Sequence, residues 1–179
     1  INTAFLSDSE QLNRDISVSQ ISTPGGPVTI NSGGQLIIDR IVTQGGDINL
    51  FAQGNMQILG LLNSSGDRGG NVTINGLTNI DIFAIDAQGL ASDGTGGNVN
   101  INAGNFFQAR GSFVDQNNRT ASISTAGTVS GGSISIRHAG SSETPFIVGN
   151  ATTNGTAAAL TTGSETISPT FEVPVDDDG

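Results

Sequence analysis

The sequence has no cysteine, tryptophan or tyrosine, and aromatic residues make up only 4% of its 179 residues. Without cysteine there is no disulfide framework. Without large rings, the interior must be built from aliphatic and β-branched side chains. Long apolar runs are also missing, because no window approaches the 18 consecutive apolar residues of a membrane-spanning helix. We therefore expect no membrane span.

Basic residues are few, with six Lys plus Arg against 16 Asp plus Glu and a formal net charge of −10. A nucleic-acid partner would need a basic face, so this balance argues against one. His138 is the only histidine. With no second histidine and no cysteine, a catalytic triad or a metal cluster has little to draw on. We expect His138 to be a surface residue near a corner of the chain.

Glycine, in contrast, is abundant at 26 residues, and much of it belongs to one repeated phrase. Each copy has a glycine pair followed by two apolar residues in alternation, which is the period of a strand with one buried face. The copies read "GGPVTI", "GGDINL", "GGNVTI", "GGNVNI" and "GGSISI" and begin at Gly25, Gly45, Gly69, Gly96 and Gly131.

The apolar positions also align when the chain is shifted by one repeat. Val28 falls on Ile48 and then on Val72, and Ile41 falls on Leu61. Units of about 20 residues that each offer one apolar face must stack to bury it. This predicts an all-β fold, a parallel β-helix of about five to seven coils with a minimal repeat of roughly 20 residues.

Insertions are expected at one corner of each coil, just before the next glycine pair, where they would form a ridge. They read "NSSGDR", "AQGLASDGT" and "DQNNRTASISTAGTVS". We expect the glycine pairs to allow positive φ at a tight corner. Later in the chain, Phe107 and Ala109 correspond to Ile80 and Ile82, and Phe113 or Val114 would take the third position with a shift.

Two groups of carboxylates are candidates for a functional site. Asp81 and Asp86 flank one coil, and Asp39 is expected to stack below Asp81. Acid–base cleavage of a sugar needs two carboxyls roughly 5 to 10 Å apart in a cleft that holds the ring, and a chain without Trp or Tyr supplies a poor platform. We therefore expect no enzyme, no cofactor and no metal site. The run Asp176 to Asp178 is expected to be a solvated tail, with calcium binding left open.

The two ends matter because a β-helix exposes strand edges at its top and bottom. We divide the chain into an N-terminal cap or donated segment (1–15), a β-helix (16–170) and a C-terminal strand with an acidic tail (171–179). Each terminal segment could cap its own molecule or dock on the next subunit. The candidate assembly residues are Phe5, Leu6, Leu12, Phe171, Val173 and Val175.

The stretch "GGSISIRHAGSSETPFIVGNATTNGTAAALTTGSETISPT", residues 131–170, resembles a region of large cyanobacterial proteins. Those are filamentous-haemagglutinin-like secreted proteins of the two-partner secretion type, some of which carry a CHAT domain. The resemblance implies a secreted, right-handed β-helix used in adhesion or surface structure. The Cys–His pair of a CHAT domain is absent, so no peptidase activity is carried over. Because the chain begins at Ile1, we expect a processed product or a fragment of a longer protein.

These observations predict an extracellular structural subunit, secreted or at the cell surface, that polymerises head to tail by strand pairing. The alternative is a monomeric adhesin segment that binds a glycan or another surface partner. Its contact would be the corner-loop ridge at residues 115–130, with the candidate residues Asn117, Asn118, Arg119 and Thr120.

Overall fold

The computed structural model describes residues 14–141 and 143–172, and this part of the chain contains strands but no helix. Accordingly, no helix within it is long and apolar enough to cross a membrane. The predicted N-terminal segment lies outside the described residues except for Arg14 and Asp15. The acidic tail and the candidate assembly residues Val173 and Val175 also lie outside them.

Two sheets form the walls of a coil. The five-stranded sheet has the order β12-β8-β6-β4-β2. Its strands are β2 (Val28–Ser32), β4 (Ile48–Ala52), β6 (Val72–Gly76), β8 (Val99–Ala103) and β12 (Ile134–Arg137).

The 12-stranded sheet has the main order β1-β3-β5-β7-β9-β14-β13-β17, with four strands off this path. The main strands are β1 (Ile16–Ser22), β3 (Leu36–Val42), β5 (Met56–Asn63), β7 (Ile80–Asp86), β9 (Phe107–Ala109), β14 (Gly155–Thr156), β13 (Ile147–Val148) and β17 (Phe171–Glu172). Off the path are β10 (Phe113–Val114), β11 (Thr120–Ser124), β15 (Ala159–Thr161) and β16 (Thr166–Ile167).

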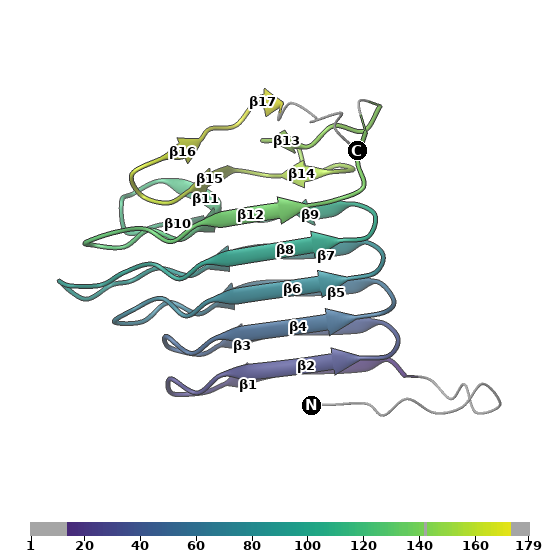
Figure 1. Cartoon of the computed structure of the whole chain (residues 1–179), viewed down its shortest axis with the longest axis horizontal. Helices are drawn as coiled ribbons and strands as arrows, with labels where there is room; N and C mark the ends of the chain where they lie inside the picture. The colour runs from purple at the N-terminus through teal and green to yellow at the C-terminus, as the bar shows by residue number, and fades with distance from the viewer. Residues whose placement is uncertain (1–13, 142, 173–179) are drawn as a thin grey trace.

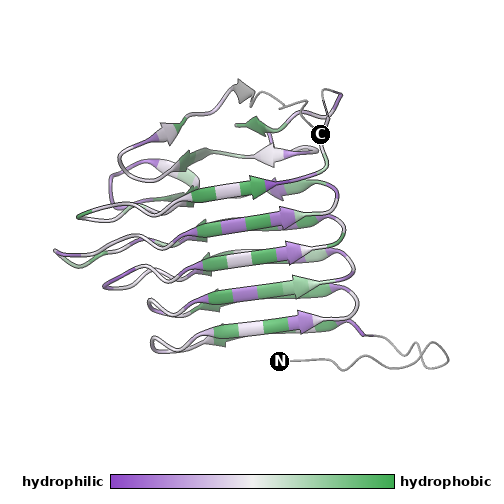
Figure 2. Cartoon of the chain, viewed as in Figure 1, coloured by the Kyte–Doolittle hydropathy of each residue, from purple (hydrophilic) through white to green (hydrophobic). Residues whose placement is uncertain are grey.

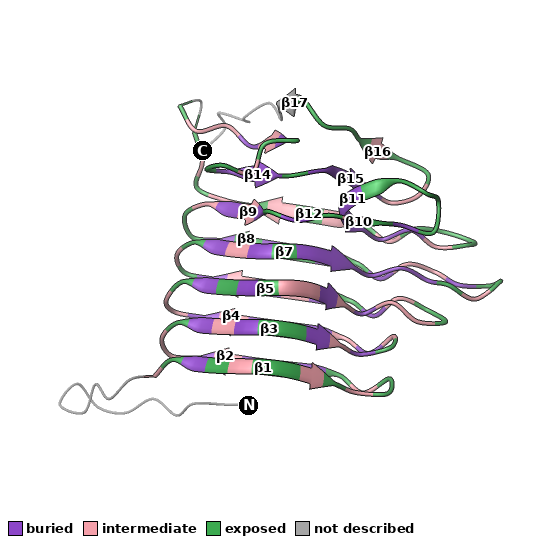
Figure 3. Ribbon diagram, turned by 180° about the vertical axis from the view of Figure 1, so that it is seen from behind, coloured by how far each residue is buried: buried purple, intermediate pink, exposed green. Residues whose placement is uncertain are grey.

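The chain climbs from one sheet to the other in a right-handed coil, which confirms the predicted β-helix. In Figure 1 the strands of the five-stranded sheet run to the right in front, and Figure 3 places β1, β3, β5 and β7 on the opposite face. Four parallel pairings link the five strands, which gives about four regular turns. The predicted five to seven coils are slightly too many, because the chain after β12 adds no further strand to this sheet.

The core consists of columns of aliphatic side chains, and the predicted register is confirmed for them. Val28 pairs with Ile48, Ile48 with Val72, and Val72 with Val99. Ile134 completes the column over Val99. The residues between these positions face outward, and Figure 2 displays the resulting alternation of hydropathy along each strand.

Two parts of the register differ from the prediction. Ile41 pairs with Leu62 rather than Leu61, because β5 is irregular between Ile58 and Leu61 and shifts the following residues by one. Ile123 of β11, not Phe113 or Val114, pairs with Ile85. Val114 is 62% exposed, since the chain leaves the stack after β9 and returns through the antiparallel pair β10–β11.

The two corners of the coil are built differently. One corner is tight and always three residues long, at residues 33–35, 53–55, 77–79 and 104–106. The long corner consists of residues 23–27, 43–47, 64–71, 87–98 and 125–133, which project to the left in Figure 1 as predicted. The longest predicted insertion is wrong in part, because Ala121 to Ser124 are buried in β11.

The glycine pairs have two separate roles, of which the sequence predicted one. Positive φ occurs at the first glycine of only two pairs, Gly25 (85°) and Gly45 (94°). The second glycines stack directly on one another, and a Cβ at Gly46 or Gly70 would collide with the carbonyl of the glycine one coil below. Close packing between coils therefore explains the second glycine of every repeat that has a coil beneath it, and Gly26 in the lowest coil is the exception.

Candidate functional site: the open end of the coil

The upper edge of the five-stranded sheet is formed by β12, and among the described residues no strand pairs with it on that side. In each lower coil the first inward residue donates its backbone N–H upward. Val28 donates to Asp47 O at 2.8 Å, Ile48 to Asn71 O at 2.8 Å, and Val72 to Asn98 O at 2.8 Å. Val99 continues the series to Ser133 O at 2.8 Å. Ile134 is next, and within residues 14–141 and 143–172 no strand lies over β12.

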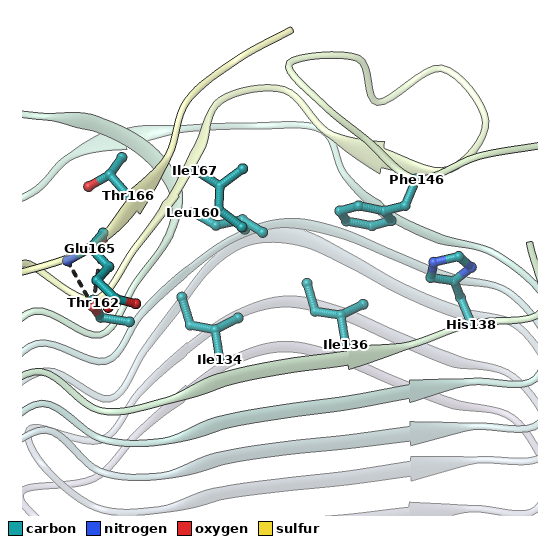
Figure 4. Close-up of a pocket in the computed structure, with 9 residues that line it drawn as sticks. All are labelled: Ile134, Ile136, His138, Phe146, Leu160, Thr162, Glu165, Thr166 and Ile167. Carbon is teal, nitrogen blue, oxygen red and sulfur yellow. Dashed lines mark hydrogen bonds between the residues drawn. The ribbon is translucent and has the colours of Figure 1, made fainter. Parts of the chain in front are cut away.

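A largely apolar cavity of about 300 Å³ lies above this edge, with Thr162, Glu165 and Thr166 as polar residues at one side. Figure 4 shows Ile134 and Ile136 of β12 on one side of the cavity, facing Leu160, Ile167 and Phe146. Both isoleucines are half-buried, whereas the equivalent Val99 and Ile101 one coil below are buried. The cavity is therefore the position that the side chains of a further strand would fill.

His138 closes one end of the cavity. Its ring stacks on Phe146 at a centroid distance of 5.3 Å, and Phe146 stacks on Phe107 of the core at 6.2 Å. The Gly140 N–H donates to His138 Nδ1 at 2.9 Å. Burial lowers the pKa of His138, which favours the neutral ring. The prediction of a surface residue near a corner holds in part, since His138 follows directly after β12 but its side chain is half-buried and packs on Phe146.

The lower end of the coil is chemically different from the upper end. A ladder of side chains links the coils just before each inward strand. Asn71 N–H donates to Asp47 Oδ1 at 2.7 Å, Asn98 N–H to Asn71 Oδ1 at 2.9 Å, and Ser133 N–H to Asn98 Oδ1 at 2.8 Å. The register places Pro27 below Asp47. Proline has no N–H to donate to a coil beneath it, so this ladder ends at Pro27.

Of the predicted assembly residues, only Phe171 lies within the described part. The backbone of Phe171 and Glu172 forms β17, which pairs antiparallel with Ile147 and Val148 of β13 in the same chain. Phe5, Leu6, Leu12, Val173 and Val175 lie outside the described residues. The structure therefore places the start of the C-terminal segment beside the open end.

The predicted partner loop is a turn held by Asp115. The buried carboxylate of Asp115 accepts the Asn117 N–H at 2.9 Å and the Arg119 N–H at 2.8 Å. Asn117, Asn118, Arg119 and Thr120 are all exposed, as a partner loop would require. The Arg119 guanidinium donates to Thr166 Oγ1, so this turn contacts the C-terminal segment. It is part of the excursion between β9 and β11, outside the main ridge of corner loops.

The carboxylates do not form the predicted stack. Asp81 pairs with Gln57, and Gln57 pairs with Ile37, so Ile37 and not Asp39 lies two coils below Asp81. Asp81 forms an ion pair with Arg110. Asp86 is buried and accepts bonds from Gln88. The two side chains therefore occupy different environments, one on the outer face and one in the interior.

Comparison with known proteins adds no function, because no family model, curated protein or solved structure matches the chain. The cavity at the open end escaped the sequence analysis, since it depends on the path of the chain after β12. The lower end did have a signal in the sequence: Pro27 occupies the position at which the next two repeats carry Asp47 and Asn71.

Proposed function

We propose that the chain is an extracellular structural subunit that assembles end to end into a filament or matrix fibre. In this assembly a strand from a second copy adds to β12. One observation carries the proposal: within the described residues the upper edge of β12 has no strand over it, and its inward side chains face an apolar cavity of about 300 Å³.

The backbone supports strand addition. A sheet edge presents N–H and C=O groups that another extended segment can pair with. Ile134 continues the series of upward donors that runs through Val28, Ile48, Val72 and Val99. A strand added in the same register would place alternate side chains over Ile134 and Ile136, where the cavity has room for them.

The charge and the ends support a second copy joined end to end. A net charge of −10 opposes broad side-by-side association of identical chains. Pro27 ends one ladder at the lower end while β12 lies at the upper end, so a contact between unlike ends would give a polar fibre. The terminal segments supply candidate strands, with Phe5, Leu6 and Leu12 in one and Phe171, Val173 and Val175 in the other. The extracellular location is supported by the resemblance of residues 131–170.

The test compares Ile136→Asp with Ser135→Asp. Both place a charge on β12, but residue 136 faces the cavity and residue 135 faces outward. Light scattering after size-exclusion chromatography, over a range of concentrations, should show large assemblies for the wild type and Ser135→Asp. Ile136→Asp should remain monomeric, because burying a carboxylate in an apolar contact is unfavourable.

Circular dichroism should report the same strand content for both variants. If Ile136→Asp unfolds, Ile134→Pro is tested in its place. Proline at this position removes the backbone N–H that would donate to the added strand. Assemblies of equal size in the cavity and outward variants would contradict the proposal. A wild type that is monomeric at every concentration would also contradict it and would favour the adhesin alternative at Asn117 to Thr120.

A further inference from the structure

A polar groove lies on the outer face of the 12-stranded sheet, away from both ends. It consists of two hollows of about 300 Å³ and about 170 Å³ that share Gln57, Asp81 and Arg110. The floor is formed by β5, β7 and β9, and Thr152 and Thr153 line one side. Figure 3 shows this face, with β5 and β7 lying one above the other.

Hydrogen-bonding groups line the groove at the spacing of the strands. Gln57, Asp81 and Gln108 stack in register, so a new group recurs about every 4.8 Å. Beside them, Asn55 Oδ1 accepts the Thr78 Oγ1–H at 2.9 Å and Asn79 Oδ1 accepts the Phe106 N–H at 3.2 Å. The NH₂ groups of these two amides remain as donors, which gives the groove both donors and acceptors.

The charges in the groove balance. The Arg110 guanidinium pairs with the Asp81 carboxylate, which holds both side chains in place. Asp81 and Arg110 are the charged side chains that line the two hollows. The groove is thus close to neutral in a chain of net charge −10. A neutral ligand fits this pattern better than a polyanion or a polycation does.

The smaller hollow adds an apolar surface. Phe83 is 39% exposed and Leu59 is 61% exposed, and both line it. A Cβ at Gly111 would collide with the ring of Phe83, so this glycine allows the backbone to pack closely against the ring. An aromatic ring of this kind can contact the apolar C–H face of a sugar. The phenylalanine supplies the platform that the absence of Trp and Tyr had argued against.

We propose that this groove binds a neutral oligosaccharide along the stacked strands. The hydroxyl groups would bond to Gln57, Gln108 and the Asp81–Arg110 pair, and one ring would lie on Phe83. This inference goes beyond the proposed assembly and does not depend on it. A groove on the side of the coil leaves both ends available and would present a row of identical sites along a fibre.

The test is isothermal titration calorimetry of the whole chain against neutral hexasaccharides: cello-, malto-, manno- and fully N-acetylated chito-oligosaccharides. A polygalacturonate oligomer serves as the anionic comparison. We expect at least one neutral probe to bind. Phe83→Ala should raise the Kd for that probe about tenfold, which corresponds to a loss of about 1.4 kcal/mol of binding free energy. Val129→Ala, at an exposed residue on the long corner, should leave the Kd unchanged.

A second variant, Gln57→Ala, separates hydrogen bonding from stacking and should also weaken binding. The proposal is overturned if no neutral probe binds with a Kd below about 1 mM, a free energy of about −4.1 kcal/mol. Equal binding by Phe83→Ala and the wild type, or preference for the anionic probe, would overturn it as well. None of these results affects the assembly proposal, which is read from light scattering.

Discussion

At the scale of single residues, the interior is mostly aliphatic, and Asp86 is the clearest exception. In the register of the strands, Asp86 pairs with Asn63 of the coil below and with Ser124 of β11. Asp86 Oδ1 accepts the Gln88 backbone N–H at 3.2 Å and the Gln88 Nε2–H at 2.9 Å. Burial raises the pKa of Asp86, the bonds from Gln88 and Ser65 lower it, and the nearby charge of Asp115 raises it further.

This environment predicts a pH-dependent stability. Because the pKa of Asp86 is higher in the folded than in the unfolded chain, its contribution to the free energy of unfolding falls as the pH rises from its ordinary value of 3.8 through the raised value. Asp86→Asn keeps an acceptor for Gln88 and removes the charge. We expect this variant to be more stable than the wild type at pH 7, with a smaller difference at pH 4.

Urea denaturation at the two pH values measures the effect. Asp39→Asn, at an exposed residue of β3, is the control for the loss of one carboxylate from the surface. A lower stability for Asp86→Asn at pH 7 would mean that the ionised carboxylate is favourable in the folded chain, contrary to this account.

At the scale of elements, strand identity and stacking register could be predicted because period-2 apolar patterns recur at fixed offsets. The prediction held for β2, β4, β6 and β8, where each strand has five residues and a constant tight corner follows. It missed the shift in β5 because this strand carries one extra residue between Ile58 and Leu61, which the apolar pattern does not reveal. It misplaced β11 because Ala121 and Ile123, which complete the core, lie within a run rich in Asn, Thr and Ser that was assigned to an insertion.

The close contact between stacked second glycines predicts the effect of adding a side chain to one of them. A Cβ at Gly70 would collide with the carbonyl of Gly46, and backbone on backbone cannot move aside cheaply. We expect Gly70→Ala to lower the free energy of unfolding by about 3 kcal/mol, as overpacked core sites do. Thermal or urea unfolding of the purified variant measures it.

Gly26 is the matched control because it occupies the same position in the lowest described coil. A Cβ there would meet only Thr23, at 3.7 Å, and Gly26 has no positive φ. Gly26→Ala should therefore be neutral or slightly stabilising. An equal decrease in the free energy of unfolding at both positions would show that close packing between the stacked glycines is not the cause.

At the scale of the whole molecule, the sequence predicted a stack with unequal corners and exposed ends but not the cavity at the upper end. The end of the side-chain ladder at Pro27 could be predicted from sequence, because it depends on one position of the repeat, occupied by Pro27, Asp47 and Asn71 in turn. The cavity above Ile134 and Ile136 could not be predicted without knowing that the strands after β12 join the other sheet. The side groove likewise depends on the distant residues Gln57, Arg110 and Thr152 lying on one face.

The central claim is that the open end at β12 takes up a strand of another copy, and electron cryo-microscopy of the assembled chain tests it most directly. Strand layers of about 4.8 Å, with five in one sheet and eight along the main path of the other, predict an axial repeat of about 25 to 40 Å. The density should place a strand of the neighbouring copy over Ile134 and Ile136. Fibres in which β12 remains uncovered, with subunits joined through their sides, would contradict the account.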